Sequence, residues 1–174
     1  MSTKIKSEKI LFNSTRFRVI SQTIAFGATR EKRDLIEMGP GVSIVVLDKD
    51  NNVCLIKEWR SAFDKYIYQL PGGFCGSNNE ELLMEAAKQE VREELGLPTT
   101  RTVLKKLKAF YLLGGMRNTV HIYLTTVNQF AQKPQGETFE AIELASMPLK
   151  EAYERFVLGN EPTTATTIIG LTTV

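Results

Sequence analysis

Three glutamates near the end of one predicted helix are the residues of this chain best suited to chemistry. Glu90 and Glu94 stand four positions apart, and Glu93 lies between them. Residues at this spacing share a face of a helix, so their carboxylates would lie close together. Like charges so placed destabilise an isolated helix. A hard divalent cation with oxygen ligands would offset the repulsion, and the spacing therefore indicates a metal site.

The alternative is a solvated helix face, because Glu is a good helix former and often accompanies Lys and Arg. The charged residues that fit this alternative are Glu80, Glu85, Lys88 and Arg92. Glu90 and Glu94 fit it less well, because they border the apolar stripe of the helix. That stripe consists of Met84, Ala87, Val91 and Leu95. The helix by itself leaves both interpretations open.

The helix and the turn before it resemble the Nudix box, whose pattern is G-x5-E-x7-R-E-U-x-E-E-x-G-U with U a bulky apolar residue. The matching residues of the second half are Glu90, Val91, Glu93, Glu94, Gly96 and Leu97. The turn Gln69-Leu70-Pro71-Gly72-Gly73 matches the usual approach to the box. So many fixed spacings make the match specific. Gly96, with Pro98 beyond it, is also a typical helix end.

The chain departs from this pattern at two places. Gln89 stands where the family has an Arg that helps orient the catalytic carboxylates. If Glu81 is the first Glu of the box, Gly73 lies two residues too far upstream, which indicates a small insertion in the loop 74–79. These departures bear on the rate of catalysis more than on the metal site.

Further segments resemble the ADP-ribose pyrophosphatase branch of the family. Glu58-Trp59-Arg60, followed by the turn at Gly72, is similar to the Q-Y-R…E-L-P-A-G signature of that branch, and the segment 147–152 is similar to its ending. The resemblance implies that Arg60 holds the substrate, since a planar guanidinium suits a diphosphate or a stacked base. A surface ion pair is the alternative for Arg60. Trp59 is a candidate substrate contact, although a tryptophan this close to a strand end is more often core.

The resemblance also implies a ligand set and a reaction. Glu90, Glu94 and the backbone carbonyl of Gly72 would bind Mg²⁺, with Mn²⁺ as a substitute, and Glu93 would be a further ligand or the proton acceptor. The reaction would be hydrolysis of the diphosphate of ADP-ribose or a nucleotide sugar to two monophosphates.

The general base is not fixed by the sequence. The branch supplies a loop Glu at the position of Thr119, whereas Arg117 nearby would place a positive charge beside the diphosphate. Replacement bases are a carboxylate of the box, or Glu137 or Glu140. His121, the only histidine, is interpreted as a structural residue, although imidazole is suited to proton transfer.

Composition is that of an ordinary folded enzyme. The chain has 174 residues, 43% of them hydrophobic and 24% charged, with a net charge of +2. We therefore expect no nucleic-acid or membrane partner. Cys54 and Cys75 show neither zinc spacing nor a disulfide framework. The N-terminus carries no long apolar segment, so we predict a cytoplasmic protein.

Hydrophobic patterning predicts an α/β sandwich, the fold that the Nudix resemblance also implies. The predicted strands cover residues 17–25, 32–38, 42–47, 53–57, 103–112 and 119–127, with a short strand at 140–144. The predicted helices cover 80–95, 149–158 and a Thr-rich segment from 163 onward. Residues 1–40 resemble the N-terminal strands that pack across a homodimer in the branch, and residues 41–174 would form the hydrolase domain.

Two further functions remain open beside the magnesium-dependent pyrophosphatase. One is a Nudix-fold module that binds a nucleotide ligand with little turnover, which would suit Gln89 and Thr119. The other is a nucleoside triphosphate pyrophosphatase, favoured if the N-terminal strands form no dimer. The acidic cluster favours catalysis, because a pure binder gains little from mutually repelling carboxylates.

Overall fold

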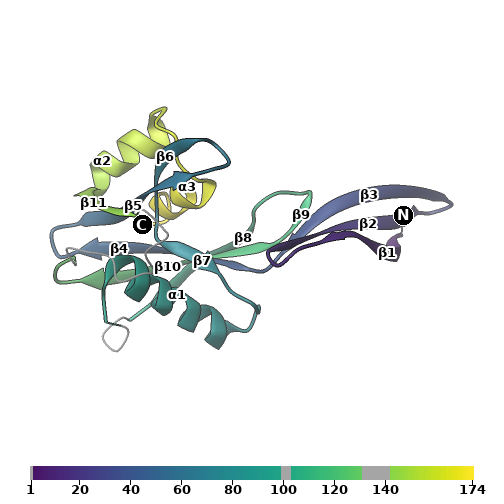
Figure 1. The fold of residues 1–174 in the computed structure, drawn as a ribbon, viewed down its shortest axis with the longest axis horizontal. Helices are drawn as coiled ribbons and strands as arrows, with labels where there is room; N and C mark the ends of the chain where they lie inside the picture. The colour runs from purple at the N-terminus through teal and green to yellow at the C-terminus, as the bar shows by residue number, and fades with distance from the viewer. Residues whose placement is uncertain (1, 99–102, 131–141) are drawn as a thin grey trace.

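A seven-stranded mixed sheet forms the body of the chain in this computed structural model, which describes residues 2–98, 103–130 and 142–174 (Figure 1). The main strand order is β11-β5-β4-β10-β8, with β6 beside β5 and β7 beside β4. The strands are β4 (Gly41–Asp48), β5 (Asn52–Arg60), β6 (Lys65–Gln69), β7 (Gly72–Phe74), β8 (Lys105–Tyr111), β10 (Thr119–Val127) and β11 (Glu143–Pro148). The central pair β4 and β10 runs parallel.

Helices cover both faces of this sheet, which explains why β4 is a nearly continuous apolar run. Helix α1 (Glu80–Leu95) packs on one face through Leu83, Ala87 and Val91. The other face carries α2 (Leu149–Tyr153), the π-helical turn Glu154–Leu158 and α3 (Ala165–Leu171). The predicted α/β sandwich is confirmed, and Figure 1 shows the sheet between α1 and the pair α2 and α3.

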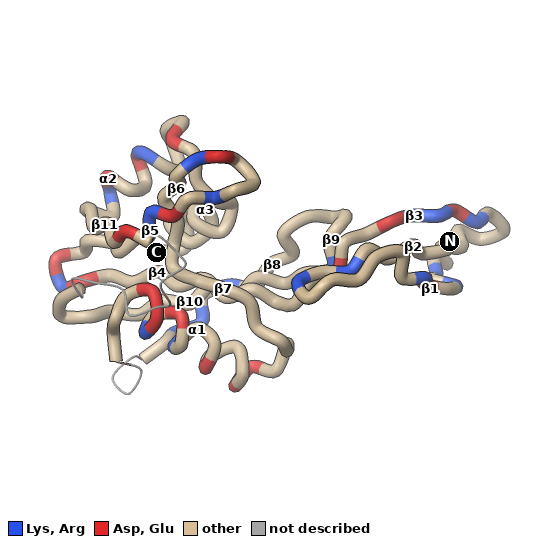
Figure 2. Tube along the Cα trace, viewed as in Figure 1, with Lys and Arg blue, Asp and Glu red and all other residues tan. Residues whose placement is uncertain are grey.

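Local signals fix the ends of α1 where the sequence predicts them. The side chain of Asn79 accepts hydrogen bonds from the amides of Glu81 and Leu82, which caps the N-terminus. Gly96 ends the helix with φ of 65°, a left-handed conformation that glycine adopts without steric cost. Glu90, Glu93 and Glu94 therefore lie in the last two turns of α1; Figure 2 shows acidic residues along this helix.

An antiparallel three-stranded arm projects from the body (Figure 1). It consists of β1 (Thr3–Asn13), β2 (Phe17–Phe26) and β3 (Thr29–Met38), and β3 also pairs with β9 (Met116–Arg117). The sequence predicts β2 and β3 but not β1. Every residue of β1 is exposed, and its apolar residues are mixed with charged ones, so the strand lacks the alternation that marks a half-buried strand.

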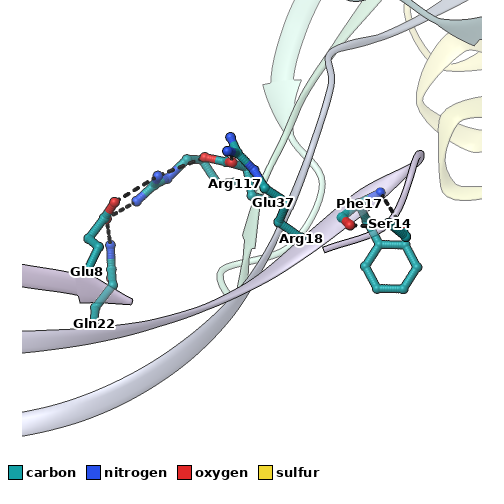
Figure 3. Close-up of polar contacts among 7 residues, drawn as sticks. All are labelled: Glu8, Ser14, Phe17, Arg18, Gln22, Glu37 and Arg117. Carbon is teal, nitrogen blue, oxygen red and sulfur yellow. Dashed lines mark hydrogen bonds and ion pairs between the residues drawn. The ribbon is translucent and has the colours of Figure 1, made fainter. Parts of the chain in front are cut away.

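A polar cluster joins the arm to β9 (Figure 3). The guanidinium of Arg117 forms ion pairs with Glu8 on β1 and Glu37 on β3, and Arg18 also pairs with Glu37. Gln22 donates a hydrogen bond of 2.6 Å to Glu8. The hydrogen bond from Arg117 lowers the pKa of the Glu8 carboxyl below its usual range. Arg117 thus has its partners in the arm.

The remaining predicted elements agree with the structure apart from their ends. Residues 103–112 contain β8, and the helix predicted over 149–158 becomes a short α-helix continued by a π-helical turn. The Thr-rich segment does contain a helix, α3, capped by the side chain of Thr164. The short strand predicted at 140–144 is β11 from Glu143, whereas residues 140 and 141 lie outside the described residues. No helix in the described ranges is long and apolar enough to cross a membrane.

Candidate functional site

A groove of 570 Å³ lies between the C-terminal half of α1 and the strands β5 and β7. Its acidic lining residues are Glu58, Glu90 and Glu94, and its basic ones are Arg16 and Arg60. Arg16 belongs to the turn between β1 and β2, so the base of the arm also reaches the groove. Carboxylates and guanidinium groups thus line one hollow, a combination suited to a cation and an anion together.

Two glycines of β7 let the backbone approach the carboxylates of α1 closely. The amide of Gly72 donates a hydrogen bond of 2.9 Å to Oε2 of Glu94, a side chain only 8% exposed. A Cβ on Gly73 would lie 2.7 Å from Cδ of Glu90 and closer still to its Oε1. A side chain at Gly73 would therefore collide with the carboxylate of Glu90. The Nudix resemblance implies that Gly72 lies near Glu90 and Glu94, and the structure has the turn and the helix in contact at these residues.

Glu93 lies on the outer side of α1 and does not line the groove. Its Oε1 accepts hydrogen bonds from Gln89 at 2.8 Å and from Arg92 at 3.3 Å. Within the described part of the chain, no three His, Cys, Asp or Glu side chains are grouped closely enough to hold a metal ion. Of the four predicted ligands, the structure thus places Gly72, Glu90 and Glu94 at the groove and turns Glu93 away from it.

Glu58 is a groove residue whose role sequence reasoning missed. Its carboxylate accepts a hydrogen bond of 2.7 Å from buried Gln69 and forms an ion pair of 2.9 Å with Arg60. Arg60 also donates to the side-chain oxygen of Gln69 at 3.2 Å. Glu58 stands at the first position of the segment that resembles Q-Y-R, and this acidic residue at the end of an apolar strand was the available signal. Arg60 fits both interpretations of its role: it forms an ion pair with Glu58, and it lines the groove where a substrate could bind.

Comparison with known proteins places this arrangement in a family. A sequence model described as NUDIX domain matches residues 37–166, most of the chain. The chain belongs to the Nudix family. It is 29% identical over 129 residues to an ADP-ribose pyrophosphatase of Mycobacterium tuberculosis (strain ATCC 25618 / H37Rv). The alignment covers 73% of this chain and 61% of that protein, so the chain spans less than two thirds of the length of this relative.

Gln89 occupies the position of the orienting Arg of the Nudix box. Its side-chain amide donates to Glu93 across one turn of α1, and both side chains lie on the solvent side of the helix. An amide donates a weaker hydrogen bond to a carboxylate than a guanidinium does, because it carries no charge. Gln89 therefore orients one box carboxylate, Glu93.

Replacing Gln89 with Arg is expected to leave kcat/KM of the Nudix reaction unchanged or to raise it, because Arg also reaches a carboxylate four residues away. Gln89→Ala removes this donor from Glu93, which points away from the groove, so kcat/KM should change by less than the roughly 10- to 100-fold typical of losing a group that orients a bound metal ligand. Steady-state kinetics at saturating magnesium measures both. A collapse of activity in Gln89→Arg would contradict this account of the box.

The other predicted substrate contacts lie outside the groove. Trp59 is 46% exposed at the end of β5, so it is not a core residue, which was the alternative to a substrate contact. Arg117 and Thr119 line another hollow, of 670 Å³, where the arm meets the body; it adjoins the groove, with which it shares Arg16. Trp59 and Arg117 remain predictions as substrate-binding residues.

Of the candidate bases outside the box, His121 is the one that lies in the described part of the chain. Glu137 and Glu140 lie outside the described residues. His121 is buried on β10, and neither ring nitrogen has a hydrogen-bond partner in the described structure. Burial lowers the pKa of this imidazole, which favours its neutral form. His121 is not among the residues that line the groove.

Proposed function

We propose that this chain is a magnesium-dependent Nudix hydrolase that cleaves the diphosphate of ADP-ribose or a nucleotide sugar into two monophosphates. The observation that carries the proposal is the groove, in which Glu90 and Glu94 face the glycines of β7 beside the guanidinium of Arg60. Carboxylates can hold a divalent cation, and a guanidinium can bind phosphate oxygens in bidentate fashion. A diphosphate bridging the two would complete the arrangement.

The residues at the groove fit magnesium, which prefers oxygen ligands and commonly uses one or two carboxylates together with water and substrate phosphate. Glu90 and Glu94 would hold the ion, with the carbonyl of Gly72 as a further ligand. Glu93 would join them only after turning away from Gln89. When bound, magnesium supplies charge neutralisation of the diphosphate and lowers the pKa of the attacking water. Mn²⁺ offers the same donor preference and would substitute.

The protein side chains have separate roles in this proposal. Arg60 binds the diphosphate, and Glu58 and Gln69 hold its guanidinium in place through their hydrogen bonds. Arg16 supplies a second positive charge at the rim. Glu90, at the groove, accepts a proton from water or serves only as a ligand, and Glu93 takes the proton in the alternative assignment.

The test is a substrate panel with purified protein and magnesium, which compares ADP-ribose, GDP-mannose, other nucleotide sugars, dinucleotides and triphosphates. We expect monophosphate release from at least one diphosphate-linked substrate and its loss when EDTA removes the metal. Binding of ADP-ribose without turnover of any compound would favour the binding module instead. Turnover confined to triphosphates would favour the triphosphate pyrophosphatase.

We also propose that residues 1–40 mediate a homodimer and that residues 41–174 form the hydrolase domain. Phe12 and Ile36 both face the cross-strand neighbour Val19, so they share one face of the arm with Phe17. All three side chains are exposed. Ile5 and Ile10 lie on the opposite face of the arm, where they pair with Ile24 and Ile20 of β2. Both are also exposed. Exposed apolar side chains gathered in this way are typical of an interaction surface.

Phe12→Glu is expected to convert the dimer to a monomer, because it places a charge in the apolar face of the arm. Sedimentation velocity measures the mass of each variant. Lys49→Glu is the control, since it changes the charge of an exposed residue in the turn between β4 and β5, outside the arm, and should leave the dimer intact. A monomeric wild-type protein would contradict the dimer.

A further inference from the structure

A smaller cavity, of 220 Å³, lies beside the groove on the opposite side of β7. It shares Arg60, Gly72, Gly73 and Phe74 with the groove, so the two hollows are adjacent. Gly72 stands between them. Its amide donates a hydrogen bond to Glu94 in the groove. On the neighbouring strand β4, Gly72 pairs with Ser43, which lines the cavity. A Cβ on Gly72 would lie 2.9 Å from Cα of Ser43, so only glycine lets the two strands approach this closely.

Two buried polar side chains of this cavity have unpartnered oxygens. Oγ of Ser43 and Oδ1 of Asn118 make no hydrogen bond in the described structure, although the residues are only 4% and 6% exposed. A buried polar atom without a partner destabilises the fold, so a ligand that bonds to these oxygens would offset that loss. The amide nitrogen of Asn118 donates to the carbonyl of Gly39 at 2.5 Å, which leaves Oδ1 as the free acceptor. Both residues line the cavity, which makes these two oxygens the candidate hydrogen-bond partners of a ligand there.

The rest of the lining is mostly apolar. It includes Met38, Val42, Leu70, Leu112, Met116 and Val120. Such walls disfavour a charged group and a group with many hydroxyls, because each buried hydroxyl needs its own partner. The volume is below the roughly 300–1,000 Å³ of pockets that enclose a whole drug-sized ligand. One flat ring with a few polar edge atoms fits these constraints.

The Thr-rich segment before α3 builds one wall of the cavity. Thr164 and Thr166 line it, and their hydroxyls bond to each other at 2.9 Å. Thr167 accepts a hydrogen bond of 3.0 Å from the amide of Leu70, which fixes this segment to the turn before β7. The wall is therefore held by the same turn that approaches the carboxylates of the groove.

We propose that this cavity binds the nucleobase of the substrate, with Oδ1 of Asn118 accepting from a ring or exocyclic N–H and the hydroxyl of Ser43 bonding to a second edge atom. The proposal rests on the proposed function, because the adjoining groove would hold the diphosphate. Arg60, which lines both hollows, marks where the base and the diphosphate would join. Ser43 and Asn118 would then determine which base is accepted.

Ser43→Val tests the assignment, because it removes the hydroxyl and adds a methyl group where the ring would lie. Thr125→Val is the matched control. Thr125 is another buried strand residue, 2% exposed, whose hydroxyl lacks a partner in the described structure. It shares the α1 face of β10 with Tyr123 and lines none of the hollows described above. Both substitutions remove an unsatisfied hydroxyl, so both should keep or raise the melting temperature.

Two measurements are made on each variant. Isothermal titration with AMP, GMP, UMP and CMP without metal gives base binding, and kcat/KM on nucleotide sugars that differ only in the base gives base preference. We expect Ser43→Val to weaken binding of the preferred monophosphate at least tenfold and to reduce the preference among bases. Thr125→Val should change neither.

Three results would overturn the base assignment. They are unchanged monophosphate binding in Ser43→Val, an equal loss in Thr125→Val, and an altered preference among sugars with the base preference retained. The last result would place the second moiety in the cavity. Failure of the proposed function is a separate result, namely no hydrolysis by the wild-type protein, and monophosphate binding then still decides whether the cavity takes a base.

Discussion

Replacing Glu94 with Gln is expected to reduce hydrolysis at least about 100-fold. The substitution keeps the size of the side chain, and its amide oxygen can still accept the hydrogen bond from Gly72. It removes the negative charge that a hard cation requires. Loss of a group that merely orients a ligand typically costs 10- to 100-fold, and loss of a ligand should cost at least as much. Steady-state kinetics over a range of magnesium concentrations measures both the rate and the affinity for the metal.

The control for this variant is Glu85→Gln on the same helix. Glu85 is exposed and pairs with Lys88 at 2.8 Å, outside the groove. An exposed ion pair of this kind contributes little, so kcat/KM should stay within about twofold. If Glu94→Gln retained wild-type activity at every magnesium concentration, Glu94 would not be a metal ligand.

Gly73→Ala is expected to lower kcat/KM by about 100-fold with little loss of stability. The added methyl group would collide with the carboxylate of Glu90 at the groove. That carboxylate is the far end of a flexible side chain, so it can move aside at small cost to folding. Displacing a catalytic group by about 1 Å can reduce the rate about 100-fold. Kinetics and a thermal melt of the same preparation separate the two effects.

Gly76→Ala is the matched control, because a Cβ at Gly76 meets no atom within 4 Å. Both variants add one methyl group to the short segment between β6 and α1, so a general effect of this segment would appear in both. Full activity in Gly73→Ala would show that the position of the Glu90 carboxylate over Gly73 is not required. Equal losses in both variants would trace the effect to loop flexibility instead.

Local sequence signals were sufficient for α1 and its acidic face. The cap at Asn79, the closing glycine at position 96 and the four-residue spacing of Glu90 and Glu94 each act within a turn or two of helix. The central hairpin of β4 and β5 was equally predictable, because apolar runs flank a polar turn. The strand β1 was not, since its partners lie on β2 and its own residues are all exposed.

Expectations drawn from single residues were less secure than those drawn from patterns. For Trp59 the residue type favoured the core over a substrate contact, yet the side chain is exposed near the end of β5. Glu58 had no assigned role, although its carboxylate lies at the groove with Gln69 and Arg60. The burial of a strand residue and its side-chain contacts depend on which strand lies beside it. The residue type alone does not specify that neighbour.

The sequence by itself determined that this chain has the fold of the Nudix family and a helix with clustered carboxylates, because both follow from patterns of fixed spacing. Only the tertiary structure decided which side chains share the groove. The bond from Gly72 to Glu94 spans 22 residues, and that from Arg117 to Glu37 spans 80. The cavity of Ser43 and Asn118 likewise joins residues distant in the chain. Contacts over such separations arise from strand pairing and helix packing, and they leave no regular spacing in the sequence.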